Sequence, residues 1–249
     1  MAFIPVECPH CKGIEVDKHG KSSVGKQRYY CKNCKTTFQL DYSYNACSPS
    51  ICSQIYFQTI NGSGTRAIAR SLQISTNTVT AVLKSFEPQI WHVNYDYIMT
   101  LMKQEQELSV DILSATEAEM DEMWSFVHDK SQQYWLWWAI DHNTGVPLAF
   151  CFGTKEYKYL EKLKGMLEVY FTINTIFVDG NPAYQEVMTE SEIIVGKQNT
   201  QKIERKHLSL RTWCSRLVRK GIRFSKSHLL HSIVVGLVIN HWFFKHFFF

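Results

Sequence analysis

Three neighbouring stretches decide the fold of this chain: EMDEMWSFV at residues 119–127, QYWLWWAID at 133–141 and VPLAFCF at 146–152. Each stretch is a short run rich in aromatic and β-branched residues, which is the composition of a β-strand. The polar turns DKSQ and HNTG separate the three stretches. Consecutive strands joined by turns this short predict an antiparallel meander.

The pattern changes after the meander. Helical periodicity from Tyr157 to Tyr170 is followed by TIFVD at 175–179, by a short apolar run at 193–195, and by a basic helix from about Thr200. Three antiparallel strands followed by alternating strands and helices is the element order of a ribonuclease H-like α/β fold with a mixed sheet. We therefore predict such a domain over residues 109–249.

The residues before the meander predict two further domains and a linker. Residues 1–42 are rich in cysteine and turns, and residues 50–87 have helical patterns that break at the NGSG sequence of residues 61–64. The interval 88–108 begins with a proline and ends in the polar sequence KQEQE. Such a composition predicts a linker that is helical in part. The chain is thus expected to be multidomain.

The first domain is predicted to be a zinc ribbon. Cys8, Cys11, Cys31 and Cys34 form two C-x2-C pairs with nineteen residues between them. Four thiolates bind Zn²⁺ tetrahedrally and leave no open position, so the predicted zinc is structural. A segment this small cannot bury enough core to fold without the metal. The alternative is four unrelated cysteines. His10 lies within the first pair and is interpreted as a bystander, because four thiols are available.

Charge is distributed unevenly along the chain. The net charge is +4, but residues 1–40 hold seven Lys and Arg against three acids, and residues 197–226 hold ten against one. Residues 101–128 reverse this balance, with seven acids and one lysine. Gathered bases favour polyanion binding and gathered acids favour metal binding, the alternative being ordinary solvated faces. Without a signal peptide or a membrane segment in the sequence, we expect a protein of the reducing cytoplasm.

Residues 65–86 fit a helix-turn-helix. TRAIARSL and TNTVTAVLKSF are the two helical stretches, and Ser75 is a natural N-cap for the second. Side chains just after this cap would face the major groove, where Asn and Thr read base edges, while nearby cations would hold phosphates. The predicted base readers are Thr76, Asn77 and Thr80, and the predicted phosphate contacts are Arg66, Arg70 and Lys84. The alternative is an ordinary pair of packed helices.

Three carboxylates from separate elements suggest a two-metal site. Asp121 lies in the first strand of the meander, Asp179 ends TIFVD, and Glu204 is the single acid in the basic helix. Three such carboxylates can hold two Mg²⁺ or Mn²⁺ ions for phosphodiester transfer. Other acids compete for these roles. They are Glu119 and Glu122, if the register of the first strand shifts by one, Asp141 as a fourth ligand, and Asp111 as a weaker candidate.

Together these motifs resemble the insertion-sequence-one family of bacterial transposases, along almost the whole chain. The resemblance rests on the cysteine pairs, ARSLQISTNTVTAVLK, MDEMW, VDGNPAY and QKIERKHLSLRTWCSRLVRKGIRFSKS. It implies a DDE triad in which MDEMW supplies Asp121, VDG supplies Asp179 and IER supplies Glu204, with 24 residues between the last two. It also implies accessory roles in catalysis or DNA contact for His207 and Arg211, which follow Glu204 on one helical face.

Two features depart from the family pattern. His207 stands where an asparagine is expected, and the C-terminal helix is more apolar than expected. Neither replaces a residue of the triad, so we expect the departures to bear on end specificity and on the contacts of the C-terminus rather than on the chemistry.

The resemblance implies a DNA transposase. The zinc ribbon and helix-turn-helix would bind the terminal inverted repeats of an insertion sequence. The C-terminal domain, a polynucleotidyl transferase, would cleave the 3′ ends and join them to target DNA by metal-dependent transesterification. The expected partners are double-stranded DNA and further copies of the chain in an oligomer on that DNA, at the bacterial nucleoid. The alternatives are a DNA-binding regulator of transposition without catalysis and a structure-specific nuclease of similar fold.

Overall fold

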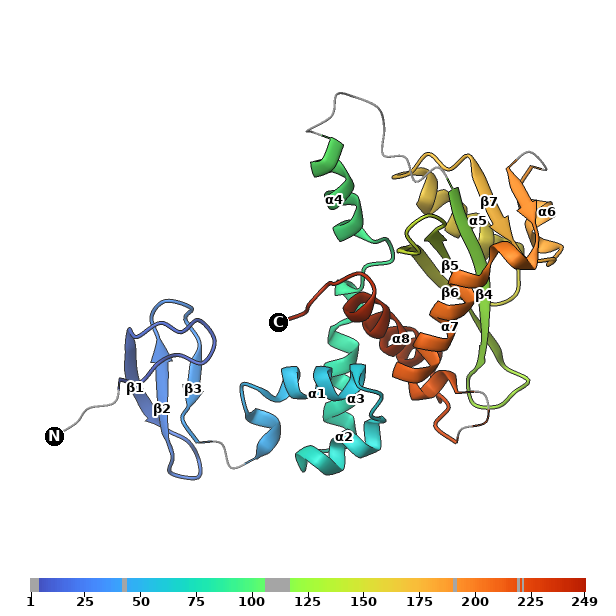
Figure 1. Ribbon diagram of the computed structural model, residues 1–249. Helices are drawn as coiled ribbons and strands as arrows, with labels where there is room; N and C mark the ends of the chain where they lie inside the picture. The colour runs from blue at the N-terminus through green and yellow to red at the C-terminus, as the bar shows by residue number, and fades with distance from the viewer. Residues whose placement is uncertain (1–4, 42–43, 106–116, 190–191, 219, 221) are drawn as a thin grey trace.

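The computed structural model describes residues 5–41, 44–105, 117–189, 192–218, 220 and 222–249 (Figure 1). Asp111, one of the alternative candidate ligands, lies outside these residues, as does the end of the interval 88–108.

The N-terminal region is a small antiparallel sheet. Its strands are β1 (Val16–Lys21), β2 (Gln27–Cys31) and β3 (Thr37–Gln39), with β2 in the centre. The buried core of this sheet consists of two cysteines and one aromatic ring, Cys8, Cys31 and Phe38. A core of three side chains buries too little apolar surface to hold the region together by itself. The cysteine cluster at one end of the sheet must therefore supply stability.

A helical region follows, formed by η1 (Asn45–Cys47), α1 (Ile51–Ile60), α2 (Thr65–Leu72) and α3 (Thr76–Ser85). The side chain of Ser75 caps α3 by accepting a hydrogen bond from the backbone N–H of Thr78 at 3.0 Å, as the sequence predicted. The tight turn before it places Gln73 at a positive φ of 55° and buries Ile74. This turn sets α3 against α2 in the helix-turn-helix arrangement.

The C-terminal region is built on a mixed five-stranded sheet in the order β6-β5-β4-β7-β8. The first three strands form the predicted antiparallel meander, and the last two run parallel to β4. The strands are β4 (Glu117–Phe126), β5 (Gln133–Asp141), β6 (Pro147–Gly153), β7 (Thr175–Val178) and β8 (Ile193–Val195). The topology confirms the ribonuclease H-like fold.

Helices cover both faces of this sheet. On one face lie α5 (Tyr157–Glu168) and α6 (Ala183–Val187), and on the other lie α7 (Gln201–Trp213) and α8 (His228–Trp242). Because side chains alternate along a strand, Met120 of β4 is buried on the α5 side and Met123 on the α8 side. Two short helices, η3 (Lys197–Asn199) and η4 (Ser215–Leu217), flank α7.

The interval 88–108, expected to be a linker, is attached to the sheet over much of its described part. After η2 (Glu87–Gln89), the backbone N–H of Asn94 donates to the carbonyl of Leu148 at 2.8 Å, and that of Phe150 donates to the carbonyl of His92 at 2.9 Å. These bonds extend the edge of β6. The helix α4 (Tyr95–Glu105) then begins, and its Ile98 is buried in the same core as α5.

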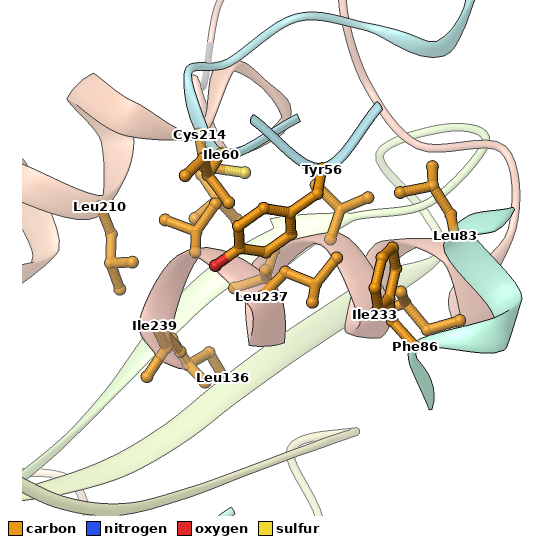
Figure 2. Close-up of a cluster of buried hydrophobic side chains, with 14 of the residues drawn as sticks. Tyr56, Ile60, Leu83, Phe86, Leu136, Leu210, Cys214, Ile233, Leu237 and Ile239 are labelled. Carbon is orange, nitrogen blue, oxygen red and sulfur yellow. The ribbon is translucent and has the colours of Figure 1, made fainter. Parts of the chain in front are cut away.

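The C-terminal helix α8 joins the helix-turn-helix to the sheet. This helix is apolar on all sides, and every residue from Ile233 to Asn240 is buried. A helix without a polar face must be surrounded by protein, and α8 lies between β5 and the helices α1 and α3. Figure 2 shows the resulting cluster, with Tyr56 of α1, Leu136 of β5 and Leu237 of α8 in one group. The excess of apolar residues noted in the sequence is thus explained by burial within the chain.

The aromatic residues after α8 complete this core. The rings of Phe248 and Phe249 lie 5.4 and 5.6 Å from the ring of Tyr56, and both lie against Phe86. The Tyr56 hydroxyl is hydrogen bonded to Nδ1 of His241 at 2.7 Å. No helix in the described part of the chain is long and apolar enough to cross a membrane.

Candidate active site and DNA-binding surfaces

The four N-terminal cysteines form one cluster. The Sγ atoms of Cys8 and Cys34 lie 3.6 Å apart, those of Cys11 and Cys31 lie 3.5 Å apart, and all four lie within 4.8 Å of one another. Tetrahedral Zn–S bonds of about 2.3 Å place sulfurs roughly 3.8 Å apart, so these separations fit a four-thiolate metal site. His10 is not part of the cluster that the described residues form.

The two cysteine pairs sit in equivalent turns. The backbone N–H of Cys8 donates to the carbonyl of Gly13 at 2.9 Å, and that of Cys31 donates to the carbonyl of Thr36 at 3.0 Å. The residue after each pair, Lys12 or Lys35, has a positive φ of 58° or 57°. This left-handed conformation is unusual for a lysine and closes each turn so that both thiols point the same way. The backbone of each turn therefore already has a conformation that directs its two thiols toward one metal.

In the C-terminal domain, parallel strands bring two aspartates together. Glu119 of β4 is opposite Phe177 of β7. Asp121 and Asp179 each lie two residues further along the chain, Asp179 directly after the end of β7. Carboxylate oxygens of Asp121, Asp179 and Glu122 all lie within 4.8 Å of one another. A carboxylate group of this kind offers the oxygen ligands that divalent cations such as Mg²⁺ prefer.

Glu204 faces this cluster from helix α7. It lines a pocket of about 290 Å³ together with Asp121, Glu122, His207 and Arg211. The group of three within 4.8 Å contains Glu122 rather than Glu204, so the Glu204 carboxylate lines the pocket but lies outside this group. Burial, and next the neighbouring carboxylates of Glu122, Asp179 and Glu204, raise the pKa of Asp121 to about 8. The site therefore gathers several carboxyl groups around a partly buried Asp121.

Glu122 has partners that the sequence did not predict. Its carboxylate accepts hydrogen bonds from Nδ2 of Asn181 at 2.6 Å and from the hydroxyl of Tyr184 at 3.0 Å. The backbone N–H of Asn181 in turn donates to Asp179 at 2.9 Å, in a turn closed by the aspartate side chain. The residues of VDGNPAY thus hold Asp179 and Glu122 in one network. In the sequence, Glu122 was only an alternative to Asp121.

The other candidate acids have structural partners. Glu119 is buried, accepts from the backbone N–H of Ile203 at 3.0 Å and pairs with Nδ1 of His142 at 2.9 Å. Because Ile203 lies in the first turn of α7, Glu119 stabilises the start of the helix that carries Glu204. Asp141 accepts from the backbone N–H of Thr144 at 2.8 Å, so it closes the turn after β5. Neither belongs to the carboxylate cluster of the described residues.

His207 lies next to Asp121 and is buried. Its Nδ1 is 3.6 Å from Oδ2 of Asp121, and its Nε2 is 2.8 Å from the indole nitrogen of Trp138. Arg211 is one further turn along α7 and lines the same pocket. The structure thus brings together Glu204, His207 and Arg211 on the face of α7 that looks toward Asp121.

Most of the predicted DNA contacts of the helix-turn-helix are exposed. Arg66, Arg70, Asn77 and Lys84 all have exposed side chains on α2 or α3. Thr76 is also exposed and Thr80 is half-buried, and both line a groove between these helices and the C-terminal domain, together with Arg66. All of the predicted DNA contacts except Thr80 are therefore exposed to solvent.

Comparison with protein families gives three matches in succession along the chain. The model described as IS1 transposase matches residues 114–247. The InsA N-terminal domain, a zinc ribbon, matches residues 1–35, and the InsA C-terminal domain, a helix-turn-helix, matches residues 42–87. The three matches agree in kind and order with the three regions of the fold.

Among curated proteins, the chain is similar to insertion element InsB proteins. The iso-IS1n protein InsB of Shigella dysenteriae is 39% identical over 131 residues, which cover 53% of this chain and 96% of the relative. The IS1 protein InsB of Shigella flexneri is 39% identical over 123 residues, 49% of this chain and 93% of the relative.

Solved structures give more distant likenesses. The catalytic core domain of BIV integrase has a TM-score of 0.36 and 13% identity, over 51% of this chain and 83% of that one. A chain of a simian T-cell lymphotropic virus intasome, in complex with the PP2A regulatory subunit B56 gamma, has a TM-score of 0.38 and 14% identity, over 76% of this chain and 66% of that one. Neither likeness bears on the activity of this chain.

Proposed function

Because this chain belongs to the IS1 transposase family, we propose that Asp121, Asp179 and Glu204 are the carboxylates of its DDE active site. One observation carries the proposal. Asp121 of β4 and Asp179, directly after β7, lie within 4.8 Å of each other, and Glu204 of α7 lines a pocket with Asp121. Carboxylates gathered in this way from three separate elements support metal-assisted phosphodiester transfer more than they support any structural role.

The donors in this pocket fit Mg²⁺ or Mn²⁺. All are carboxylate oxygens, and burial together with the neighbouring carboxylates raises the pKa of Asp121, so a bound cation would favour its ionised form. When bound, two divalent cations would activate the attacking oxygen and stabilise the leaving oxygen. Glu122 would hold Asp179 in position through Asn181, while His207 orients Asp121 and Arg211 contacts the DNA phosphate near the cleaved bond.

The N-terminal cluster fits zinc. Four thiols with separations near those of a tetrahedral site, in a region with a core of three side chains, support a structural Zn²⁺ bound by Cys8, Cys11, Cys31 and Cys34. No position would remain open for a substrate. The role of this zinc would be to fold the ribbon and present its basic surface to DNA.

The helix-turn-helix supplies sequence recognition in this proposal. Asn77, with Thr76 and Thr80, would read base edges of the terminal inverted repeats, and Arg66, Arg70 and Lys84 would hold phosphates. The exposure of these cations supports the assignment. The catalytic domain would cleave the 3′ ends and join them to target DNA. Joining two ends to one target needs two active sites, so the working state on DNA would be an oligomer.

A joining assay tests the proposal. Labelled duplexes that end in the inverted repeat flanking the gene are incubated with target DNA and Mg²⁺. The variants Asp121→Asn, Asp179→Asn and Glu204→Gln each keep the size of the side chain and remove one negative charge, so each should abolish cleavage and joining while DNA and zinc binding remain. The matched control is Glu168→Gln, an exposed acid on α5. Joining at the wild-type rate by Asp179→Asn would overturn the active-site assignment.

A further inference from the structure

A groove of about 490 Å³ separates the helix-turn-helix from the C-terminal domain. One wall is formed by the starts of α2 and α3, and the other by residues of η4, by residues 222–227 and by the start of α8. We call it the interdomain groove. The charged side chains in its lining are four cations: Arg66, Arg216, Arg223 and Lys226.

The charged side chains that line the interdomain groove are all cations, and they lie beside apolar side chains such as Ile222 and Phe224. Its lining contains no Asp or Glu among the described residues, and none of its four cations forms an ion pair with a described carboxylate. Arg216 is partly buried, and this burial lowers the pKa of its guanidinium. A partly buried cation without a counter-charge is costly, and an anion in the groove would offset that cost.

Three helices also begin at this groove. Gly64 and Thr65 start α2, Thr76 starts α3, and Ser227 caps α8, and all four line it. The first backbone N–H groups of a helix have no acceptor within the helix, and the helix dipole makes this end positive. Convergence of three such ends favours a ligand with several negative oxygens rather than a single small anion.

The two walls are held in fixed positions. Arg216 donates hydrogen bonds to the hydroxyls of Ser225 at 3.2 Å and of Thr65 at 3.4 Å, so it bridges the groove at its base. The carbonyl of Ser225 accepts from the backbone N–H of His128 at 2.8 Å, which ties this wall to the end of β4. The hydroxyl of Ser215 donates to the carbonyl of Gly62 at 2.9 Å, in the turn before α2. The groove is therefore formed before any ligand arrives.

We propose that the interdomain groove binds the sugar-phosphate backbone of duplex DNA, so that Arg223 and Lys226 of the catalytic domain contact the same DNA as the helix-turn-helix. The inference rests on the proposed function. The volume is far too small for a whole duplex, but it admits one backbone beside the major groove that α3 faces. The helix-turn-helix and the C-terminal domain, which the sequence motifs treat as separate, would then both bind the transposon end.

The salt dependence of DNA binding tests this inference. The full-length chain is titrated into a fluorescent duplex carrying the inverted repeat, without divalent metal, at several salt concentrations. In Arg223→Gln/Lys226→Gln, the slope of log affinity against log salt should fall by roughly two, because each phosphate contact contributes about 0.9 to it. The matched control is Lys158→Gln/Lys162→Gln on α5, which removes equal charge from the opposite face of the sheet.

Phosphate ethylation interference supplies the second measurement. The double variant should lose interference at one or two adjacent phosphates and keep the remaining pattern. Both side chains are exposed, so a thermal melt should show the fold unchanged. An unchanged slope and interference pattern, with a wild type that binds the duplex, would overturn this inference and leave the proposed active site untouched. A wild type that does not bind the duplex would overturn both.

Discussion

The indole N–H of Trp138 donates a hydrogen bond to Nε2 of His207 at 2.8 Å, and the two rings are stacked with a 15° angle between their planes. An indole nitrogen can only donate, so Nε2 of His207 must accept. The proton of the neutral imidazole is therefore on Nδ1, which faces Oδ2 of Asp121 at 3.6 Å. A buried tryptophan on β5 thus sets which nitrogen of His207 is presented to the proposed active site.

Replacement of Trp138 by phenylalanine keeps a stacked ring and removes the N–H. We expect joining to slow by at least several-fold, because His207 can then adopt either tautomer beside Asp121. The free energy of unfolding should fall by about 1–3 kcal/mol, the cost of a buried acceptor without a partner. The ¹⁵N chemical shifts of the His207 ring report the tautomer directly.

Trp137→Phe is the matched control for this prediction. Trp137 is equally buried, and its indole N–H donates to the carbonyl of Thr154 at 3.1 Å, on the other face of the same strand. It should lose comparable stability and leave the His207 signals and joining unchanged. Equal loss of joining in both variants would mean that Trp138 acts through stability alone.

The pKa of Asp121 predicts how stability depends on pH when no divalent cation is present. Its folded value of about 8 lies above the ordinary 3.8, so between these two values the folded chain holds a proton that the unfolded chain has released. The free energy of unfolding should then decrease as pH rises from about 4 to about 8, by up to about 1.4 kcal/mol per pH unit from this group. Chemical denaturation of wild type and Asp121→Asn at several pH values isolates the contribution. A difference between the two proteins that stays constant with pH would contradict it.

The cysteine cluster predicts one tightly held zinc per chain. Cys31→Ser/Cys34→Ser removes two of four thiolates, so the purified variant should contain no zinc and its ribbon should be unfolded, with weaker DNA binding. Metal analysis and amide hydrogen exchange of residues 16–39 measure both effects. Cys47→Ser, at an exposed thiol outside the cluster, should retain the metal. Absence of zinc from the wild type would refute the ribbon as a metal site.

Replacement of Asn77 should change the base specificity of DNA binding, whereas replacement of Lys84 should change the overall affinity. Both are exposed on α3, but an amide reads base edges and an ammonium holds phosphates. Asn77→Ala should cost about 1–3 kcal/mol at the base that it reads and relax specificity there. Lys84→Ala should weaken binding to cognate and random duplexes alike. Gel-shift titrations with both duplexes separate the two outcomes, and unchanged specificity in Asn77→Ala would remove it from the recognition surface.

Local patterns in the sequence were sufficient for the elements that local chemistry determines. The strand composition of EMDEMWSFV, the N-cap Ser75 and the cysteine spacing each depend on residues close together in the chain. The partners of Glu122 could not be predicted in the same way, because they depend on how β4 and β7 lie beside each other. The burial of α8 likewise depends on contacts with Tyr56, far away in sequence, so the sequence showed its apolar character without the reason for it.

The shared core around α8 also affects the distance along the DNA between the recognised sequence and the cut site. Since α8 is in contact with both the sheet and the helices α1 and α3, α3 cannot turn independently of the strand that carries Asp121. In the proposed function, the spacing in base pairs between the sequence that α3 would read and the bond that would be cut is therefore set by the protein. Bases inserted between the two would move the cut site by the same number of positions, rather than being absorbed by a flexible joint.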